Sequence, residues 1–271
     1  MANNKVQLAD GTTLMDISDS TVTEDALLDG VVAYNAAGDK IVGTMRRPTT
    51  PYMEAEYIVE DDTDGVPSHY IKRAKLYNHT AIYMKEFSGQ AQLQNLDFSD
   101  ASNNITVIEE NAFEYARMDG LVLPSTISVL GNACFTGASI ATLTVPPLVT
   151  VLPDAAFTYI QPVHNTETGE EVPINIILPQ NLTKIGNSCF NGASIKQITI
   201  PDTVTEIGDA AFLFCRKLES ITCLAATPPA LGTDALYTDT AGFPIKVPAA
   251  SVAAYKAADG WKDYASYIVA M

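Results

Sequence analysis

The chain has 271 residues, of which 47% are hydrophobic, so it can bury a substantial core and is not disordered as a whole. Its 16 Lys and Arg stand against 32 Asp and Glu, a net charge of −16 that argues against nucleic-acid and anionic-membrane partners. Because no basic segment with a following apolar run opens the chain, and no apolar stretch reaches about 18 residues, we expect synthesis in a cytoplasm and no membrane insertion.

Residues 1–45 are predicted to form a small β-rich N-terminal module. We expect a strand over Gly11–Ile17, a short helix opened by a capping box at Thr21–Glu24, and a hairpin that pairs Val31–Tyr34 with Lys40–Thr44. The string TLMDISDSTVTEDALLDGVVAYNAAGDKIVGTM, above all its part from Asp25 onwards, is similar to short modules near the starts of bacteriophage tail proteins. That resemblance implies attachment to virion tail proteins through residues 1–45; the alternative is a generic N-terminal β cap.

Residues 46–79 are expected to be a linker and an N-terminal cap region. Arg46–Pro51 is rich in turn formers, which is typical of a linker. The acidic run Glu60–Asp64 could bind Ca²⁺, but it lacks the ligand spacing of an EF-hand loop and continues into a turn at Gly65. We therefore interpret the run as a solvated turn.

The middle of the chain is a tandem repeat. Similar segments end in a phenylalanine at intervals of 22, 22, 33 and 22 residues, and prolines follow with intervals of 22, 33 and 22. The long interval is one repeat plus an insertion of 11 residues. The phenylalanines are Phe113, Phe135, Phe157, Phe190 and Phe212, and the prolines are Pro124, Pro146, Pro179 and Pro201. Fainter copies begin at Phe87 and at Leu236, which makes about seven coils over residues 80–248.

The residue pattern of each repeat predicts one coil of a solenoid. An alternating apolar pair such as Leu143 and Val145 predicts a short strand with one face inward, and the following proline ends that strand. A second extended piece, for example Val149–Leu152, forms the opposite wall, and the next turn places its phenylalanine in the core. One coil cannot bury its own apolar face, so the coils must stack.

The repeat resembles a known family. The pattern I-G-x-x-A-F-x-x-C-x-x-L-x-x-I-x-[IC] around Ile207–Cys223 is similar to the BspA-like leucine-rich repeat, and the stretch from Val247 to Trp261 resembles the terminal cap of that family. The resemblance covers roughly residues 80–271. It implies a parallel-sheet solenoid used for adhesion or recognition, with no catalytic residues. The predicted fold class is therefore mainly β with short helical turns, a leucine-rich-repeat solenoid of about seven coils after a small β-rich N-terminal module.

Residues 249–271 are expected to be a C-terminal cap. Ser251 can cap a helix over Val252–Ala258, and three aromatic side chains then cover the last coil: Trp261, Tyr264 and Tyr267. Such a cover is needed because the bare end of a solenoid exposes apolar core and unpaired strand edges.

The sequence offers little that could perform chemistry. The four cysteines occupy small apolar columns of the repeat, where a free cysteine behaves as a buried hydrophobe. Cys134 and Cys189 are two coils apart, about 10 Å, which is beyond disulfide reach. His69, His79 and His164 share no metal-ligand spacing, and the chain has no phosphate loop, nucleophile elbow or HExxH motif. We predict no enzyme, cofactor or metal site.

Binding surfaces are better supported by the pattern. Two positions after each core phenylalanine the chain has, in order, Tyr115, Gly137, Tyr159, Gly192 and Phe214. Aromatic rings that alternate with glycines could form a groove for a sugar ring or a peptide; the alternative is that each ring packs over the neighbouring glycine to complete the core. An uncharged column that includes Thr144 and Thr199 is expected on the outer face of the strands.

The insertion at residues 161–171 interrupts the strict period. We expect it to be a hairpin that turns near Thr168–Gly169 and projects from the rod, carrying His164, Glu167 and Glu170. Projecting loops on a rigid scaffold are frequent sites of recognition, although irregular insertions are often neutral.

These features lead to a phage or prophage tail protein as the first functional hypothesis. Residues 1–45 would attach to the virion, and the solenoid would meet a glycan or protein on the host surface, which places the protein in the virion after synthesis in the host cytoplasm. The alternatives are a bacterial surface adhesin of the same repeat family, located at the cell surface, and a purely structural decoration of the virion. The sequence is compatible with a homo-oligomer in each case.

Overall fold

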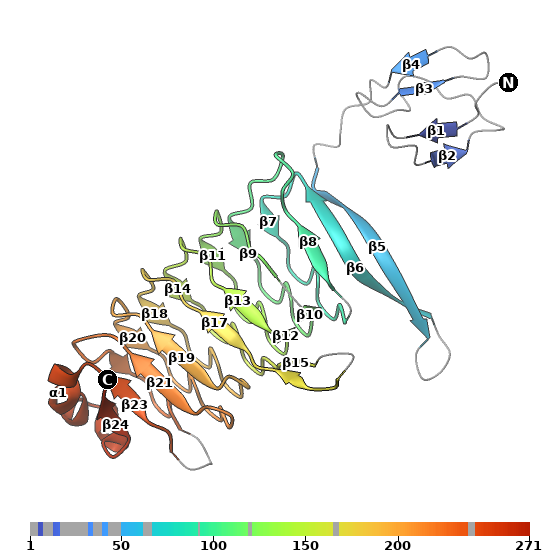
Figure 1. Cartoon of the computed structure of the whole chain (residues 1–271). Coiled ribbons are helices and arrows are strands. Elements are labelled where there is room, and N and C mark those ends of the chain that lie inside the picture. Colours follow the sequence, from blue (N-terminus) through green and yellow to red (C-terminus); the bar gives the residue numbers. More distant parts are fainter. Residues whose placement is uncertain are drawn as a thin grey trace. The chain divides into compact units, whose positions relative to one another are not determined.

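The computed structural model describes four short strands within residues 1–49, and residues 50–271 except 62–66, 92, 119–120, 165–167 and 238–241. The chain divides into two compact units, Met1–Thr50 and Pro51–Met271. In the first unit, β1 (Lys5–Gln7) pairs antiparallel with β2 (Thr13–Asp16), and β3 (Val32–Tyr34) pairs antiparallel with β4 (Lys40–Val42) (Figure 1). The predicted hairpin is present as β3 and β4, while the helix expected from Thr21 lies outside the described residues.

The second unit begins with a long antiparallel hairpin formed by β5 (Tyr52–Asp61) and β6 (Pro67–Tyr77). The rings of Tyr52 and Tyr77 stack across it with centroids 4.7 Å apart. The inner strand β6 also pairs in parallel with β8 (Asn95–Asp97), so the hairpin is the first layer of the solenoid. The acidic run was predicted to be a turn, but its first two residues, Glu60 and Asp61, belong to β5; the remainder of the run lies outside the described residues.

The solenoid has two main walls of parallel strands, each strand contributed by one coil (Figure 1). One wall contains β7 (Ala81–Ile82), β9 (Val107–Ile108), β11 (Val129–Leu130), β14 (Val151–Leu152), β18 (Lys184–Ile185), β20 (Glu206–Ile207) and β22 (Ala230–Leu231). The other wall contains β13 (Thr142–Thr144), β17 (Asn175–Ile177), β19 (Gln197–Ile200), β21 (Ser220–Cys223), β23 (Ile245–Val247) and β24 (Ile268–Ala270). A short third side is formed by β10 (Arg117–Met118) and β12 (Ser139–Ile140).

The predicted fold class is confirmed, and the solenoid has about eight turns. The repeat pattern indicated about seven because both ends lack the repeat signature. At the start, Arg73–Lys75 of β6 pairs with Asn95–Asp97, and at the end β24 pairs in parallel with β23. Neither β6 nor β24 follows a core phenylalanine at the offset of the repeat, so a search for that residue does not find them.

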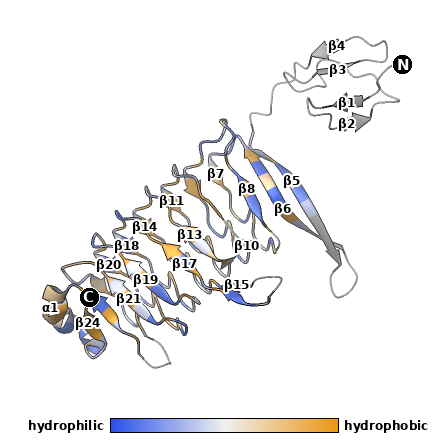
Figure 2. Ribbon diagram, in the orientation of Figure 1, coloured by the Kyte–Doolittle hydropathy of each residue, from blue (hydrophilic) through white to orange (hydrophobic). Residues whose placement is uncertain are grey.

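The core is organised around one stack of phenylalanine rings. Neighbouring ring centroids lie 5.0–5.5 Å apart, with interplanar angles of at most 13°. All six rings are fully buried: Phe87, Phe113, Phe135, Phe157, Phe190 and Phe212. In both strand walls, buried apolar residues alternate with exposed residues, some of which are themselves apolar, such as Val129 and Val151. The strand β17 has two isoleucines and is more apolar than the strands beside it (Figure 2).

The C-terminal cap is α1 (Val252–Ala257) between two 3-10 turns, Ala249–Ser251 and Trp261–Tyr264. Trp261 is fully buried, and its Nε1 donates a hydrogen bond of 2.7 Å to the Pro229 carbonyl. Its ring meets that of Tyr255 edge-on with centroids 4.9 Å apart. The cap thus covers the end of the core, as the sequence indicated. The predicted capping by Ser251 was wrong, because its side chain makes no capping hydrogen bond to the helix.

Candidate functional site

A row of exposed aromatic rings runs along one edge of the solenoid, at the turn after the core phenylalanines. Tyr115 and Tyr159 are 62% and 54% exposed. A Cβ atom on Gly137 would overlap the ring of Tyr115, and a Cβ atom on Gly192 would overlap the ring of Tyr159. Each ring therefore lies against the bare backbone of the next coil, which immobilises it and still leaves more than half of it open to a ligand.

The turn backbone explains why these rings point outward. Tyr115 and Tyr159 both have φ of 54°, the left-handed region that tyrosine rarely adopts. Hydrogen bonds of 2.8 Å from Tyr115 N to Thr136 O, and from Tyr159 N to Asn191 O, tie each turn to the next coil. The stacked coils hold a backbone that costs on the order of 1–2 kcal/mol per residue in isolation. The rings are thus held before any ligand arrives.

Phe214 continues the row and borders a hollow on the surface. Its ring is 39% exposed, with the Arg216 guanidinium carbon 5.9 Å from the ring centroid and the ring of Tyr237 edge-on at 6.0 Å. Between Tyr159 and Phe214 is a hollow of about 440 Å³, lined by Tyr159, Gly192, Ala193, Ser194, Phe214, Arg216 and Lys217. Aromatic walls with a hydroxyl and two cations suit a polar ring ligand.

The insertion is a hairpin, as the sequence indicated. Its strands β15 (Val163–His164) and β16 (Glu171–Val172) pair antiparallel. Lys217 Nζ lies 2.8 Å from both carboxylate oxygens of Glu171, and Arg117 Nη2 donates a hydrogen bond of 2.9 Å to the His164 carbonyl. The hydrogen bond from Lys217 is the main reason that the pKa of Glu171 is lowered. Coils on both sides therefore hold the base of the hairpin, and Lys217 connects it to the hollow.

The structure brings some of the expected recognition residues together and separates others. His164 is exposed, with Nε2 3.9 Å from the Glu171 carboxylate, and Glu170 is exposed one residue further out. Glu167 lies outside the described residues. Thr144 and Thr199 are exposed on the outer face of β13 and β19, and neither lines the hollow.

The site also contains residues that the repeat pattern did not single out. Arg216 and Lys217 line the hollow, and the charge of Lys196 reaches Glu171. The signal was present, because residues 80–271 contain only nine Lys and Arg, and two of them are adjacent here. These two residues do not recur from repeat to repeat, so the columns of the repeat do not reveal them.

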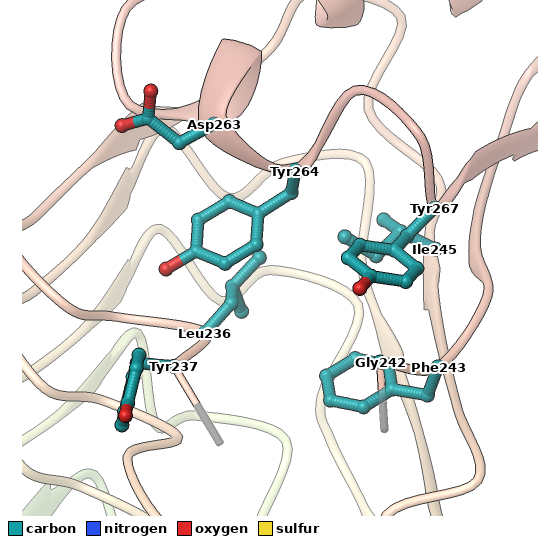
Figure 3. A pocket seen from close by; sticks show the side chains of 8 residues that line it. All are labelled: Leu236, Tyr237, Gly242, Phe243, Ile245, Asp263, Tyr264 and Tyr267. Carbon is teal, nitrogen blue, oxygen red and sulfur yellow. The ribbon is translucent and has the colours of Figure 1, made fainter. Parts of the chain in front are cut away.

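A second cavity lies beside the C-terminal cap. It has a volume of about 190 Å³ and is lined by Leu236, Tyr237, Gly242, Phe243, Ile245, Asp263, Tyr264 and Tyr267 (Figure 3). Tyr267 lies against Gly242, where a Cβ atom would overlap its ring, and is 40% exposed. The sequence assigned Tyr264 and Tyr267 only to covering the last coil; their position in a cavity wall comes from the structure.

The cysteine thiols are inaccessible to solvent. All four cysteines are buried and unpaired. Burial raises the pKa of the thiols, in Cys215 to about 12, so the reactive thiolate is suppressed. Within the described residues, no cluster of three or more His, Cys, Asp or Glu could hold a metal ion, and no helix is long and apolar enough to cross a membrane.

Comparison with known families agrees with this architecture. The model of the BspA type leucine-rich repeat region matches residues 80–173 and 172–237, in six copies. The chain belongs to the BspA-type leucine-rich repeat family. Proteins of the BspA type are typically non-enzymatic and are often found at the cell surface. The match does not include residues 1–79, and the phage-like character of the N-terminal module stays a prediction.

Solved structures with a similar fold are remote in sequence. A leucine-rich repeat protein from Bacteroides ovatus is 14% identical, with a TM-score of 0.40 over 83% of this chain and 64% of that one. A leucine-rich cell surface protein from Faecalibacterium prausnitzii is 17% identical, with a TM-score of 0.30 over 62% and 56%. The pneumococcal vaccine antigen PcpA is 16% identical, with a TM-score of 0.28 over 69% and 63%.

This BspA-type chain thus spans less than two thirds of each of these proteins. Their likeness is too remote to carry an argument about what the chain binds. No curated protein sequence matches it.

Proposed function

We propose that this BspA-type protein is a cell-surface recognition protein of the adhesin class that binds an extended glycan along its aromatic edge. The aromatic edge is defined as Tyr115, Tyr159, Phe214 and the hollow between the last two. The observation that carries the proposal is the alternation of exposed rings with glycines, which gives flat, immobile aromatic platforms in every second coil.

The platforms have the geometry that a polymeric ligand needs. Coils stack at the strand spacing, so rings in alternate coils are about 10 Å apart. An extended β-linked sugar chain presents the same ring face at every second sugar, which suits platforms in alternate coils. The C–H groups of a pyranose pack on the negative face of an aromatic ring. Because the turn backbone already holds the rings, little ordering entropy opposes binding.

Polar groups beside the platforms support a glycan rather than a purely apolar partner. Ser194, Arg216 and Lys217 line the hollow, and the Lys217–Glu171 ion pair borders it. Sugar hydroxyls can exchange hydrogen bonds with all of these groups. The exposed His164 and Glu170 of the hairpin extend the polar border.

The experiment compares attachment of the purified protein to cells and to immobilised glycans. Replacing both Tyr115 and Tyr159 by Ala should weaken attachment at least about tenfold, since aromatic anchors dominate binding energies. The matched control replaces Thr144 and Thr199 by Ala, two exposed side chains on the strand face, and should leave attachment unchanged. Equal loss in both pairs contradicts the aromatic edge as the site. Attachment that survives removal of cell-surface glycans but not protease treatment contradicts the glycan and indicates a protein partner.

A phage tail protein is the second candidate, and one observation favours it. Met1–Thr50 is a compact unit of its own, and its sequence resembles short modules of tail proteins. In that case residues 1–45 bind virion tail proteins and the same aromatic edge meets the host, or the solenoid only decorates the particle. Immunogold labelling of purified particles tests this candidate: labelled tails support it, and label confined to the bacterial surface contradicts it.

A further inference from the structure

The C-terminal cavity is walled by aromatic rings on several sides. Tyr264 belongs to the 3-10 turn Trp261–Tyr264, and Tyr267 follows that turn (Figure 3). The ring of Phe243 lies opposite that of Tyr267, and Leu236 lies between Tyr264 and Tyr237. Its volume of about 190 Å³ is below the range of about 300–1,000 Å³ typical of drug-sized ligands. The cavity therefore suits a small head group rather than a whole oligomer.

This cavity lies in negatively charged surroundings. Asp263 lines it, and within the described residues neither Asp263 nor Asp234 forms an ion pair. The neighbouring cation, Lys262, is paired with Asp259 at 2.8 Å. The negative charges of Asp234 and Asp263 both act on Tyr264 in the cavity wall. Burial is the largest cause that raises the pKa of the Tyr264 hydroxyl, and the charges of Asp234 and Asp263 raise it further.

We propose that this cavity binds an organic cation of the alkylammonium class, with the aromatic faces around the cation and the carboxylate of Asp263 in the cavity lining. The negative faces of tyrosine and phenylalanine rings attract a desolvated cation, and quaternary ammonium groups are recognised in this way. A neutral sugar could donate hydrogen bonds to these carboxylates but would gain nothing from their net charge, which attracts a cation and repels an anion. The charge, more than the shape, distinguishes this cavity from the aromatic edge, which has Arg216 and Lys217 beside its rings.

The test compares two probes of similar shape, the tetramethylammonium cation and neutral tert-butanol. Each probe has a single intense methyl NMR signal, so saturation transfer from the full-length protein reports binding of both under the same conditions. We expect tetramethylammonium to bind with a dissociation constant on the order of 1 mM, and tert-butanol to bind at least about tenfold more weakly. Equal binding of the two probes overturns the proposal, as does binding of methyl glucoside without binding of the cation.

Variants locate the site. Replacing both Asp263 and Asp234 by Asn should weaken cation binding about tenfold, and so should Tyr267→Ala, while Tyr267→Phe keeps the ring and the affinity. The matched control is Tyr115→Ala, because Tyr115 also lies against a glycine but belongs to the aromatic edge. Unchanged binding in the Asn variant overturns the proposal. Loss of cation binding in Tyr115→Ala would instead place the cation on the aromatic edge, and it overturns the assignment to this cavity.

Discussion

His79 is a buried polar residue next to the first coils. Its side chain is 2% exposed; Nδ1 lies 2.9 Å from the Tyr77 carbonyl and Nε2 lies 2.8 Å from the Glu86 carboxylate. Burial lowers the pKa of the imidazole, but the hydrogen bond and charge of Glu86, together with the Tyr77 carbonyl, outweigh it and raise the pKa above its usual value. Protonated His79 donates to both oxygens, which the neutral ring cannot do.

This arrangement predicts a stability that depends on pH. The folded pKa of His79 lies above the unfolded value of about 6.5, so the contribution is complete below about pH 6.5 and is lost as the pH rises through the folded pKa. The free energy of unfolding should therefore differ most between wild type and His79→Gln near pH 6, and the difference should shrink towards pH 9. Denaturant titrations across that range measure it. A difference that stays constant with pH contradicts the proposed role of protonation.

The buried cysteines predict slow thiol chemistry. Burial raises the pKa of all four thiols, although the Tyr255 hydroxyl, 3.1 Å from the Cys223 sulfur, partly offsets it there. At pH 8 a thiol reagent should label the native protein slowly and all four positions rapidly once guanidinium unfolds it. Mass spectrometry counts the labels. Fast labelling of the folded protein would show that a cysteine column is accessible.

At the scale of the element, the phenylalanine stack dominates the energetics. Phe135→Ala and Phe190→Ala each remove a fully buried ring between two neighbours, and each should lower the free energy of unfolding by about 3–5 kcal/mol. Thr144→Ala and Thr199→Ala change exposed side chains on the strands and should cost under about 1 kcal/mol. Chemical denaturation measures all four variants, and similar costs in the two pairs would contradict the assignment of inward and outward columns.

The insertion hairpin can be removed without changing the 22-residue period of the coils. Deleting residues 163–173 joins Pro162 to Ile174 and restores the 22-residue interval, while it keeps Gln161, whose amide N donates to Ala138 O at 2.8 Å. The solenoid should stay folded, because the lost Lys217–Glu171 pair is exposed and such pairs contribute about 0–1 kcal/mol. Circular dichroism and thermal melts check the fold.

The same deletion measures what the hairpin contributes to recognition. Attachment should weaken, because the deletion removes His164, Glu170 and the border of the hollow. The shorter deletion of residues 165–168, between β15 and β16, is the control that keeps both strands of the hairpin. A folded deletion variant with normal attachment would limit recognition to the rings of the aromatic edge.

At the scale of the whole molecule, the division at Thr50 and Pro51 can be tested. The second unit contains the phenylalanine stack, the β5–β6 hairpin at one end and the helical cap at the other. A chain of residues 51–271 should therefore fold alone and melt within about 2 °C of the full-length protein. Calorimetry compares the two. A large loss of stability would show that residues 1–50 complete the fold.

The repeat columns could be predicted from the sequence because a coil returns to the same position every 22 residues. That period alone places Phe135 over Phe113, buries Cys134 and Cys189, and turns Thr144 outward. It also places Tyr159 at the turn, but it does not say whether the ring completes the core or stays open. The structure shows that the ring does both, since Gly192 offers a surface to pack on and the other face is exposed.

Features without a period depended on the tertiary structure. The hairpin β5–β6 and the last strand β24 extend the ladder although their sequences lack the repeat signature, because a strand edge accepts any backbone that can pair with it. Lys217 meets Glu171 across 46 residues, and Tyr237, Tyr264 and Asp263 enclose one cavity, only because folding places their coils and the cap side by side. Sequence spacing orders residues within a column, and the path of the chain between columns decides which of them form a site.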